Sequence, residues 1–230
     1  MSKDKLKKVS KAHIRYKTAD GKVVPGATTI TGLLNKPWLV RWANKLGLEG
    51  IDSSKYTDEA AATGTLAHAM IQADLEGTEI DREQFSPLQV SLAENAVLSW
   101  FEWKKQHEIK PLLCEQPFVV DTLDNPFIDD MPGYGGTVDC YCMLDGIPTL
   151  LDFKTSKSIY PEYFVQLAAY KHLLQAHGNP VEQVRILRVG RDETEGFEER
   201  SIADTKWYWI IFKCLLMIYY AMKKVNWSNY

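Results

Sequence analysis

The sequence predicts a mixed α/β protein in which helices flank a central sheet. Segments with helical apolar spacing occupy much of the first half of the 230-residue chain, and strand and turn signals dominate its middle. Asp145-Gly146 is the dipeptide that best tolerates the positive φ angles of a two-residue hairpin loop. A strand, a helix and a further strand follow in that order, and such a crossover needs a parallel pair of strands.

One domain is the default at this length, although two are possible. We expect residues 25–230 to form one domain, preceded by a basic arm and a short hairpin over residues 1–24. Tyr16–Val24 should form that hairpin around Asp20-Gly21. The threonine run that follows provides candidate helix caps at Thr28, Thr29 or Thr31. Residues 31–47 have helical apolar spacing on both sides of Pro37, which predicts two short helices or one broken helix.

Two long helices are expected next. The first should run from about Thr57 for some five turns and stop at Gly77. Its inner side is predicted to consist of Leu66, Ala69, Met70 and Ala73. The second should extend from about Pro87 to His107, because apolar residues recur there at helical intervals: Val90, Ala93, Val97, Trp100 and Phe101.

The sheet is expected from the middle of the chain onward. Leu112–Val120 should be a strand, followed by the two strands of the Asp145-Gly146 hairpin. A crossover helix should run from Pro161 to about His177, before a strand over Val184–Val189. Trp207–Met222 is apolar over most of a helix surface, so we expect a buried helix or one that also meets a partner. That stretch is too short to span a bilayer.

Composition and charge exclude some classes of protein. The chain is 45% hydrophobic and 25% charged, with a net charge of −3, which excludes a uniformly basic nucleic-acid coat. The four cysteines include no CxxC pair, and buried free thiols are expected at Cys140 and Cys142. No signal peptide is apparent, so we expect a cytoplasmic, reducing location. Basic residues cluster near the N-terminus, as a solvated tail or a phosphate-contacting arm: Lys3, Lys5, Lys7, Lys8, Lys11, Arg15 and Lys17.

The predicted hairpin would gather three charged side chains on one face. If Asp145-Gly146 forms the loop, Asp139 lies directly opposite Asp152, and Lys154 points to the same face. Like charges set opposite each other are unfavourable, so this pair is expected to hold a cation. Two carboxylates beside a lysine suit Mg²⁺ or Mn²⁺. The alternative is a salt-bridged surface hairpin.

Four motifs in order resemble the PD-(D/E)xK nuclease superfamily, specifically its RecB-like branch. They are the GTLAH segment with His68, then Asp139, then DFKT over residues 152–155, then QLAAY over residues 166–170. That branch includes phage exonucleases and the mitochondrial genome maintenance exonuclease, and the resemblance runs from about Pro25 to Val189. It implies a restriction-endonuclease-like core with a three-stranded antiparallel meander, a crossover helix and a further strand.

The resemblance also implies roles for individual residues. Asp139, Asp152 and the backbone carbonyl of Phe153 would bind one or two Mg²⁺ ions. Lys154 would orient or activate the attacking water and stabilise the charge that develops at phosphorus. His68 would be a metal ligand or would support one, although an isolated histidine on a helix is more often a hydrogen-bonded core or surface residue.

Further residues are expected around that centre. In the resemblance, Gln166 holds the metal site or the scissile phosphate and Tyr170 contacts DNA; the alternative is the polar edge of an amphipathic helix. Glu115 looks like an acidic residue that many relatives carry on the strand before the hairpin. Phosphate contacts are also expected, with a solvated loop as the alternative, at Thr155, Ser156 and Lys157.

The function implied by the resemblance is a Mg²⁺- or Mn²⁺-dependent DNA exonuclease in phage or bacterial recombination, replication or end-processing. The alternatives are a structure-specific or flap endonuclease of the same fold and a non-catalytic DNA-binding subunit. The cysteine spacing does not fit the iron-sulfur members, so no cluster is expected. DNA with free ends is the expected partner, together with a possible second copy or partner protein and no membrane.

Overall fold

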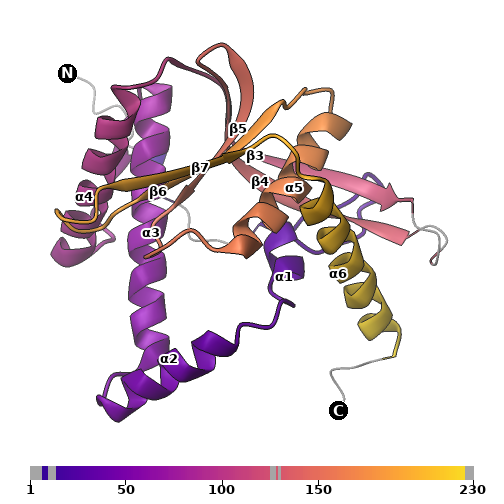
Figure 1. Cartoon of the computed structure of the whole chain (residues 1–230), viewed down its shortest axis with the longest axis horizontal. Coiled ribbons are helices and arrows are strands. Elements are labelled where there is room, and N and C mark those ends of the chain that lie inside the picture. The colour runs from indigo at the N-terminus through magenta and orange to yellow at the C-terminus, as the bar shows by residue number, and fades with distance from the viewer. Residues whose placement is uncertain (1–6, 10–13, 125–127, 129–130, 226–230) are drawn as a thin grey trace.

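A five-stranded mixed sheet flanked by helices forms the centre of the molecule (Figure 1). The computed structural model describes residues 7–9, 14–124, 128 and 131–225. Lys3, Lys5 and Lys11 of the expected basic arm lie outside the described residues, as do the side chains of Lys7 and Lys8.

The helices and strands have the following bounds. The helices are α1 Ala27–Thr31, α2 Pro37–Leu48, α3 Ser53–Glu76, α4 Pro87–Lys104, α5 Pro161–Ala176 and α6 Lys206–Lys224. The strands are β1 Lys7–Lys8, β2 Ile80–Asp81, β3 Ile109–Leu123, β4 Met131–Leu144, β5 Ile147–Lys154, β6 Gln183–Val189 and β7 Phe197–Ile202.

The order of the strands confirms the predicted fold class. The sheet has the order β3-β4-β5-β6-β7, in which β3, β4 and β5 form an antiparallel meander. β5 and β6 pair in parallel, as the crossover through α5 requires, and β7 pairs antiparallel with β6. This arrangement is consistent with a restriction-endonuclease-like fold. The sequence analysis missed β7, because its FEERSI sequence is polar and its residues are half-buried or exposed at the sheet edge.

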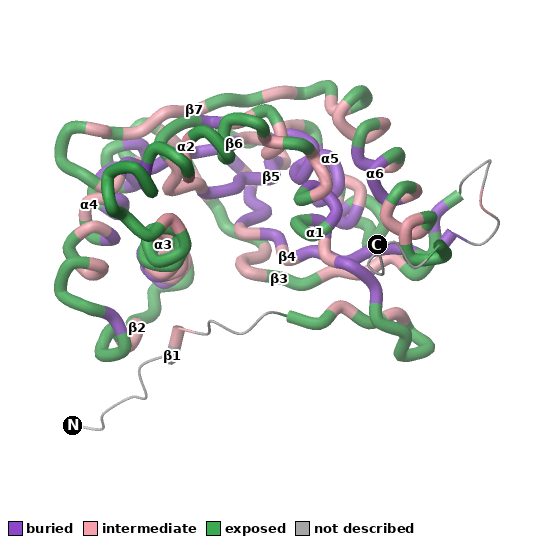
Figure 2. Tube along the Cα trace, turned by 90° about the horizontal axis from the view of Figure 1, so that it is seen from below, coloured by how far each residue is buried: buried purple, intermediate pink, exposed green. Residues whose placement is uncertain are grey.

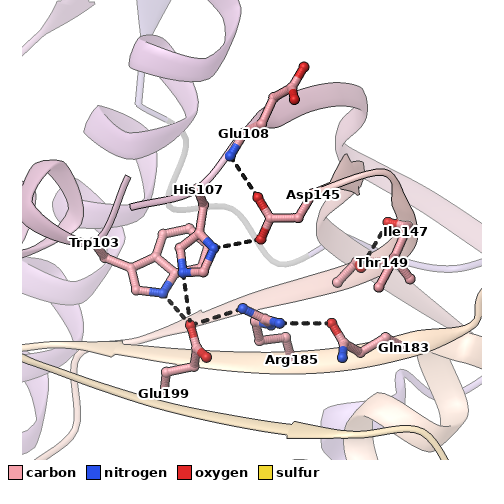
Figure 3. Close-up of polar contacts among 9 residues, drawn as sticks. All are labelled: Trp103, His107, Glu108, Asp145, Ile147, Thr149, Gln183, Arg185 and Glu199. Atoms are coloured by element: carbon pink, nitrogen blue, oxygen red, sulfur yellow. Dashed lines mark hydrogen bonds and ion pairs between the residues drawn. The ribbon is translucent and has the colours of Figure 1, made fainter. Parts of the chain in front are cut away.

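The turn between β4 and β5 has the predicted geometry. Asp145 and Gly146 both have positive φ angles, 51° and 80°, as a two-residue turn of this type requires. The Asp145 carboxylate accepts a hydrogen bond from the backbone N–H of Glu108 at 2.8 Å and contacts His107 Nδ1 at 2.7 Å (Figure 3). Pairing from Leu144–Ile147 to Cys140–Leu151 follows from this turn without a shift in register.

The sheet separates two apolar cores. On one face, α3 and α4 pack over a core that includes Leu66, Trp100 and Phe153. On the other face, α5 and α6 pack over a core that includes Leu167 and Phe212. Figure 1 shows these helix pairs on the two sides of the strands, and Figure 2 shows the buried residues gathered between them.

The two long helices were predicted well, and α3 begins four residues earlier than expected. Asp52 caps α3, because its carboxylate accepts from the backbone N–H of Ser54 at 2.9 Å and of Lys55 at 3.3 Å. Gly77 ends the helix in the left-handed conformation, as predicted. The hairpin around Asp20-Gly21 is also present, through an antiparallel bridge between Lys17 and Val23.

The expected threonine cap was wrong. Gly26 occupies the N-cap position of α1, and Thr28, Thr29 and Thr31 lie inside that short helix. The C-terminal helix α6 is buried on one side only, where it presents Phe212, Leu215 and Leu216, and its other side leaves Trp207 exposed. That this exposed side meets a partner stays a prediction. In the described part of the chain, no helix is both long and apolar enough to cross a membrane.

Candidate active site

A cleft of about 850 Å³ opens between α3, the β3–β4 pair and α5. It contains most of the charged and polar residues that the sequence analysis singled out. The residues of that set that line it are His68, Glu115, Asp139, Lys154, Thr155, Gln166 and Tyr170.

Asp139 lies where the pairing of β4 with β5 ends. The last pair is Cys140–Leu151, so Asp139 and Asp152 are the next positions in the same register. The Asp139 carboxylate accepts a hydrogen bond from the backbone N–H of Phe153 at 2.9 Å. A side chain of β4 therefore reaches the backbone of β5 beside the lysine of the motif.

Asp152 is buried, with 1% of its surface exposed. Its Oδ1 accepts no hydrogen bond from the residues that the structure describes. The ammonium of Lys154 donates to its Oδ2 at 2.5 Å, and it also lies 5.0 Å from the centre of the Tyr163 ring on α5. Lys154 is therefore the cation that balances Asp152.

Burial and like charge act together on the pKa values of the acidic pair. Loss of water raises the pKa of Asp152 to about 6; Asp139 raises it too, and the attraction of Lys154 opposes both effects. Burial also raises the pKa of Asp139. For Lys154, burial alone would lower the pKa, but the attraction of both aspartates outweighs it and raises the pKa, so the ammonium stays protonated at neutral pH.

A second group of ligand atoms lies in the same cleft as Lys154. One atom each of His68, Glu115 and Asp139 lies within 4.8 Å of the other two. The three side chains come from α3, β3 and β4. Glu115 has a φ angle of 47°, an uncommon conformation for this residue type, and it occupies the position opposite Asp139 between the pairs Cys114–Cys140 and Gln116–Val138.

His68 is neutral in this environment. Burial and, to a smaller extent, the charge of Lys154 lower its pKa to about 4, against the smaller effects of Asp152 and the Phe153 backbone. Its Nδ1 is 3.5 Å from the Asp139 carboxylate, and this contact is not an ion pair because the imidazole is uncharged at neutral pH. A neutral imidazole is the form that binds metal ions.

Gln166 and Tyr170 form the α5 wall of the cleft. Gln166 Nε2 donates a hydrogen bond to the Tyr170 hydroxyl at 2.7 Å, and both residues are buried. Gly136 on β4 makes room for this wall, because a Cβ at Gly136 would lie 2.5 Å from the Tyr170 ring. The predicted pairing of positions 166 and 170 on one helix face is therefore present.

The residues of the loop after Lys154 line two different hollows. Thr155 lines the cleft, and Gly64 of the GTLAH segment lets α3 approach it, since a Cβ there would lie 2.9 Å from Thr155 Oγ1. Ser156 donates to the Ser158 carbonyl at 2.8 Å. Lys157 lines a neighbouring hollow with Arg191, so the structure does not bring Thr155 and Lys157 into one site.

Three residues of the surroundings were missed by the sequence analysis. Tyr16 donates to or accepts from Thr137 at 2.9 Å, and its ring fits against Gly135, where a Cβ would lie 2.2 Å from it. Tyr163 lies against the ammonium of Lys154. The paired glycines of GYGG were the available signal, because adjacent glycines in a strand mark close approach of other groups.

The cleft has the chemistry of a divalent cation site. Asp152 offers one buried oxygen that accepts no hydrogen bond from the described residues, and the adjoining triad offers two carboxylates and a neutral imidazole. Oxygen-rich sites of this kind suit Mg²⁺ or Mn²⁺. Whether Asp152 and the Phe153 carbonyl bind the ion directly, as the resemblance implies, stays a prediction.

Comparisons with known proteins gave distant structural likenesses. No family model and no curated protein matches the sequence. An alkaline exonuclease from Laribacter hongkongensis, LHK-Exo, has 11% identity and a TM-score of 0.43, covering 90% of each chain. LHK-Exo in complex with dAMP gives 13% and 0.36, covering 71% of this chain and 80% of that one. SSO0001 gives 14% and 0.34, covering 82% and 74%. We therefore infer the function from the site itself.

Proposed function

We propose that the protein is a metal-dependent deoxyribonuclease that hydrolyses phosphodiester bonds from the ends of DNA. One observation carries this proposal most: a buried carboxylate that is paired with a lysine through one oxygen, and whose other oxygen accepts no hydrogen bond from the described residues, adjoins a His-Glu-Asp triad in an open cleft. The ordered motifs that contain these residues support the same reading. A closed structural salt bridge would need neither the triad nor the opening.

Each residue has a role that follows from its environment. Asp139, Glu115 and His68 would hold a divalent cation, with Asp152 beside them. When bound, such an ion supplies a bound water of lowered pKa and a positive charge close to the phosphate. Lys154 keeps its proton at neutral pH, so its ammonium donates to a phosphate oxygen and offsets the negative charge that grows there. Its raised pKa makes it unsuited to removing a proton from water.

Gln166 and Tyr170, which form the α5 wall of the cleft, orient the DNA strand. Gln166 and Tyr170 are buried and hydrogen-bonded to each other, so their polar groups are fixed before a substrate arrives. Preorganised donors of this kind do not have to reorganise as the reaction proceeds. Thr155 completes the wall on the side of the lysine.

A cleavage assay tests the proposal. End-labelled linear and covalently closed circular DNA, each single- and double-stranded, would be incubated with Mg²⁺ or Mn²⁺, beside Lys154→Ala. We expect wild type to degrade linear DNA and Lys154→Ala to lose at least 100-fold in rate, as is usual when one charge-stabilising donor is removed. If the wild-type protein leaves every substrate intact with either metal ion and Lys154→Ala behaves identically, the protein would bind DNA without cleaving it. Cleavage of the closed circles would instead favour an endonuclease.

A further inference from the structure

Helix α2 exposes an apolar and basic surface to solvent. Trp38 is 46% exposed, and Leu39, Val40 and Leu48 are also exposed. Figure 2 shows α2 as exposed along most of its length, and Figure 1 shows it away from the sheet, between the α1 side of the molecule and the first turns of α3. Exposed apolar groups gathered on one element indicate a binding surface.

Helix α2 contacts the helices of the cleft at its start and near its middle. At its start, Lys36 forms an ion pair with Glu162 of α5 at 2.9 Å, and Gln166 of the cleft wall is one helical turn further along α5. Near its middle, the Trp42 ring packs edge-on against Tyr56 of α3 at 5.7 Å, and Ala60, which lines the cleft, is one turn further along α3. Helix α2 thus contacts both α5 and α3, each about one helical turn from a residue that lines the cleft.

The charge of this segment differs from that of the whole chain. Residues 21–48 contain no acidic side chain, whereas the chain as a whole has a net charge of −3. Within and beside α2 the charged residues are Arg41, Lys36, which pairs with Glu162, and Lys45, whose exposed ammonium lies 3.9 Å from the exposed carboxylate of Glu49. A polyanion would be attracted here, and a second copy of the same face would place like charges opposite each other across a two-fold interface.

We infer that α2 and the first turn of α3 form a platform that binds unpaired bases of a single DNA strand next to the cleft. This inference rests on the proposed function for the meaning of the cleft. Aromatic side chains stack on exposed bases while lysine and arginine contact the phosphates, which is how single strands are bound without sequence preference. Trp38 and Tyr56 are the exposed rings of the platform among the described residues, and Tyr56 packs against Trp42.

The platform distinguishes between substrates. In a duplex the faces of the bases are covered by their neighbours, so Trp38 has no face to stack on. A single strand, or an end that has frayed, presents its bases to α2 while its backbone passes between α3 and α5. The preferred substrate is therefore single-stranded DNA or a duplex with a single-stranded end.

Fluorescence anisotropy with labelled oligonucleotides tests the platform. The binding of an unstructured strand of about 15 nucleotides would be measured in a chelating buffer, where hydrolysis is not required. We expect Trp38→Ala to raise Kd about tenfold and Trp38→Phe to restore most of the affinity. The matched control is Trp207→Ala, which removes a tryptophan that is 69% exposed on α6 and should leave Kd unchanged.

Further arms separate the alternatives. Trp38→Ala should not change the Kd of a blunt duplex or of an abasic strand of equal length, since neither offers a free base. Equal Kd values for Trp38→Ala and Trp207→Ala would overturn the platform, even for an active nuclease. The platform would also be overturned if Trp38→Ala weakened dimerisation or binding to anionic vesicles and left the binding of single-stranded DNA unaffected. Trp38-dependent strand binding by a protein without cleavage activity would support the platform and refute the nuclease.

Discussion

Lys154 has two roles that compete at the level of a single residue. Without a metal ion it is the charge that balances the buried Asp152, and in the proposed reaction it must serve the phosphate instead. A divalent cation beside Asp152 would therefore be repelled by the ammonium, unless that group moves toward Tyr163, whose ring lies 5.0 Å away. We therefore expect the lysine to lower the affinity of the site for the proposed ion.

A neutral residue of similar length at this position should separate the two roles. We expect Lys154→Met to bind Mn²⁺ about tenfold more tightly than wild type, which is a gain of about 1.4 kcal/mol in binding free energy. This gain is smaller than the ~4 kcal/mol by which unit charges 4 Å apart interact near a protein surface. The same variant should lose cleavage activity. Calorimetric titration measures the affinity, and Asp139→Asn is the opposite control, since it should weaken binding. Weaker binding by Lys154→Met would show that the ammonium does not oppose the ion.

At the scale of elements, the turn between β4 and β5 sets the register of the site. Asp145 holds this turn through its positive φ angle and its contacts with Glu108 and His107, and His107 in turn lies 3.5 Å from Glu199 of β7 (Figure 3). Trp103 also donates to Glu199. The turn is thereby tied to the end of α4 and to the far edge of the sheet.

Two variants of Asp145 should differ in a defined way. Asn tolerates the left-handed conformation and Ala does not, so Asp145→Ala should be less stable than Asp145→Asn by about 1–2 kcal/mol. The hydrogen bond from His107 is the main cause of the lowered pKa of Asp145. A lowered pKa stabilises the folded state above the ordinary value near 3.8 and loses this effect as pH falls.

The advantage of wild type over Asp145→Asn should therefore shrink as the pH is lowered from 6 to about 3. Thermal unfolding followed by circular dichroism across this range measures it. A constant difference would mean that the charge of Asp145 does not contribute. The difference in stability between Asp145→Ala and Asp145→Asn should be the same at every pH. Both variants lack the titrating carboxylate, and the difference comes from the backbone conformation of residue 145.

The contact between β4 and α5 leads to a second prediction at this scale. A Cβ at Gly136 would lie 2.5 Å from the Tyr170 ring and 3.0 Å from Leu173, so Gly136→Ala should push α5 outward and cost about 1–3 kcal/mol. Gly47 in α2 has no neighbour within 4 Å of such a Cβ, so Gly47→Ala should stabilise by about 0.5–1 kcal/mol. Urea unfolding of both variants checks the pair, and equal effects would contradict the close approach.

The fold could be predicted where local signals and tertiary packing agree. Asp145-Gly146 determined the hairpin, and the order of strand, helix and strand determined the parallel pair of β5 and β6. β7 was missed because an edge strand needs no apolar face, and its polar sequence resembles a loop. The exposed apolar side of α6 could not be distinguished from a buried one, because the sequence does not state which helices have neighbours.

The site could be predicted only in part, because some of its contacts depend on the folded chain. The motif order indicated Asp139, Asp152 and Lys154. The division of these residues between the His68-Glu115-Asp139 triad and the Asp152–Lys154 pair depends on the point at which the pairing of β4 with β5 ends. Glu115 enters the triad through a positive φ angle that no residue type near it signals. Tyr16 reaches β4 across more than a hundred residues of sequence. Such long-range contacts are properties of the folded chain.

At the scale of the whole molecule, the triad of His68, Glu115 and Asp139 connects elements that pack in different cores. His68 comes from α3, which packs in one core, while Glu115 and Asp139 come from strands that also contact the helices of the other face. An ion bound by all three would link α3 to the sheet and bind the folded state alone. Binding of that kind raises the unfolding temperature.

We expect about 10 mM Mn²⁺, with a Kd near 1 mM, to stabilise the protein by about 1.4 kcal/mol, which corresponds to roughly 3–6 °C for a chain of this size. His68→Asn should lose most of this shift, because the remaining carboxylates no longer connect to α3. His177→Asn is the matched control: its Nδ1 lies 2.8 Å from the Leu173 carbonyl and it lies outside the cleft. Differential scanning calorimetry with and without Mn²⁺ provides the measurement. An undiminished shift in His68→Asn would exclude the imidazole from the metal site and leave the ion with the carboxylates of the sheet, including Asp152.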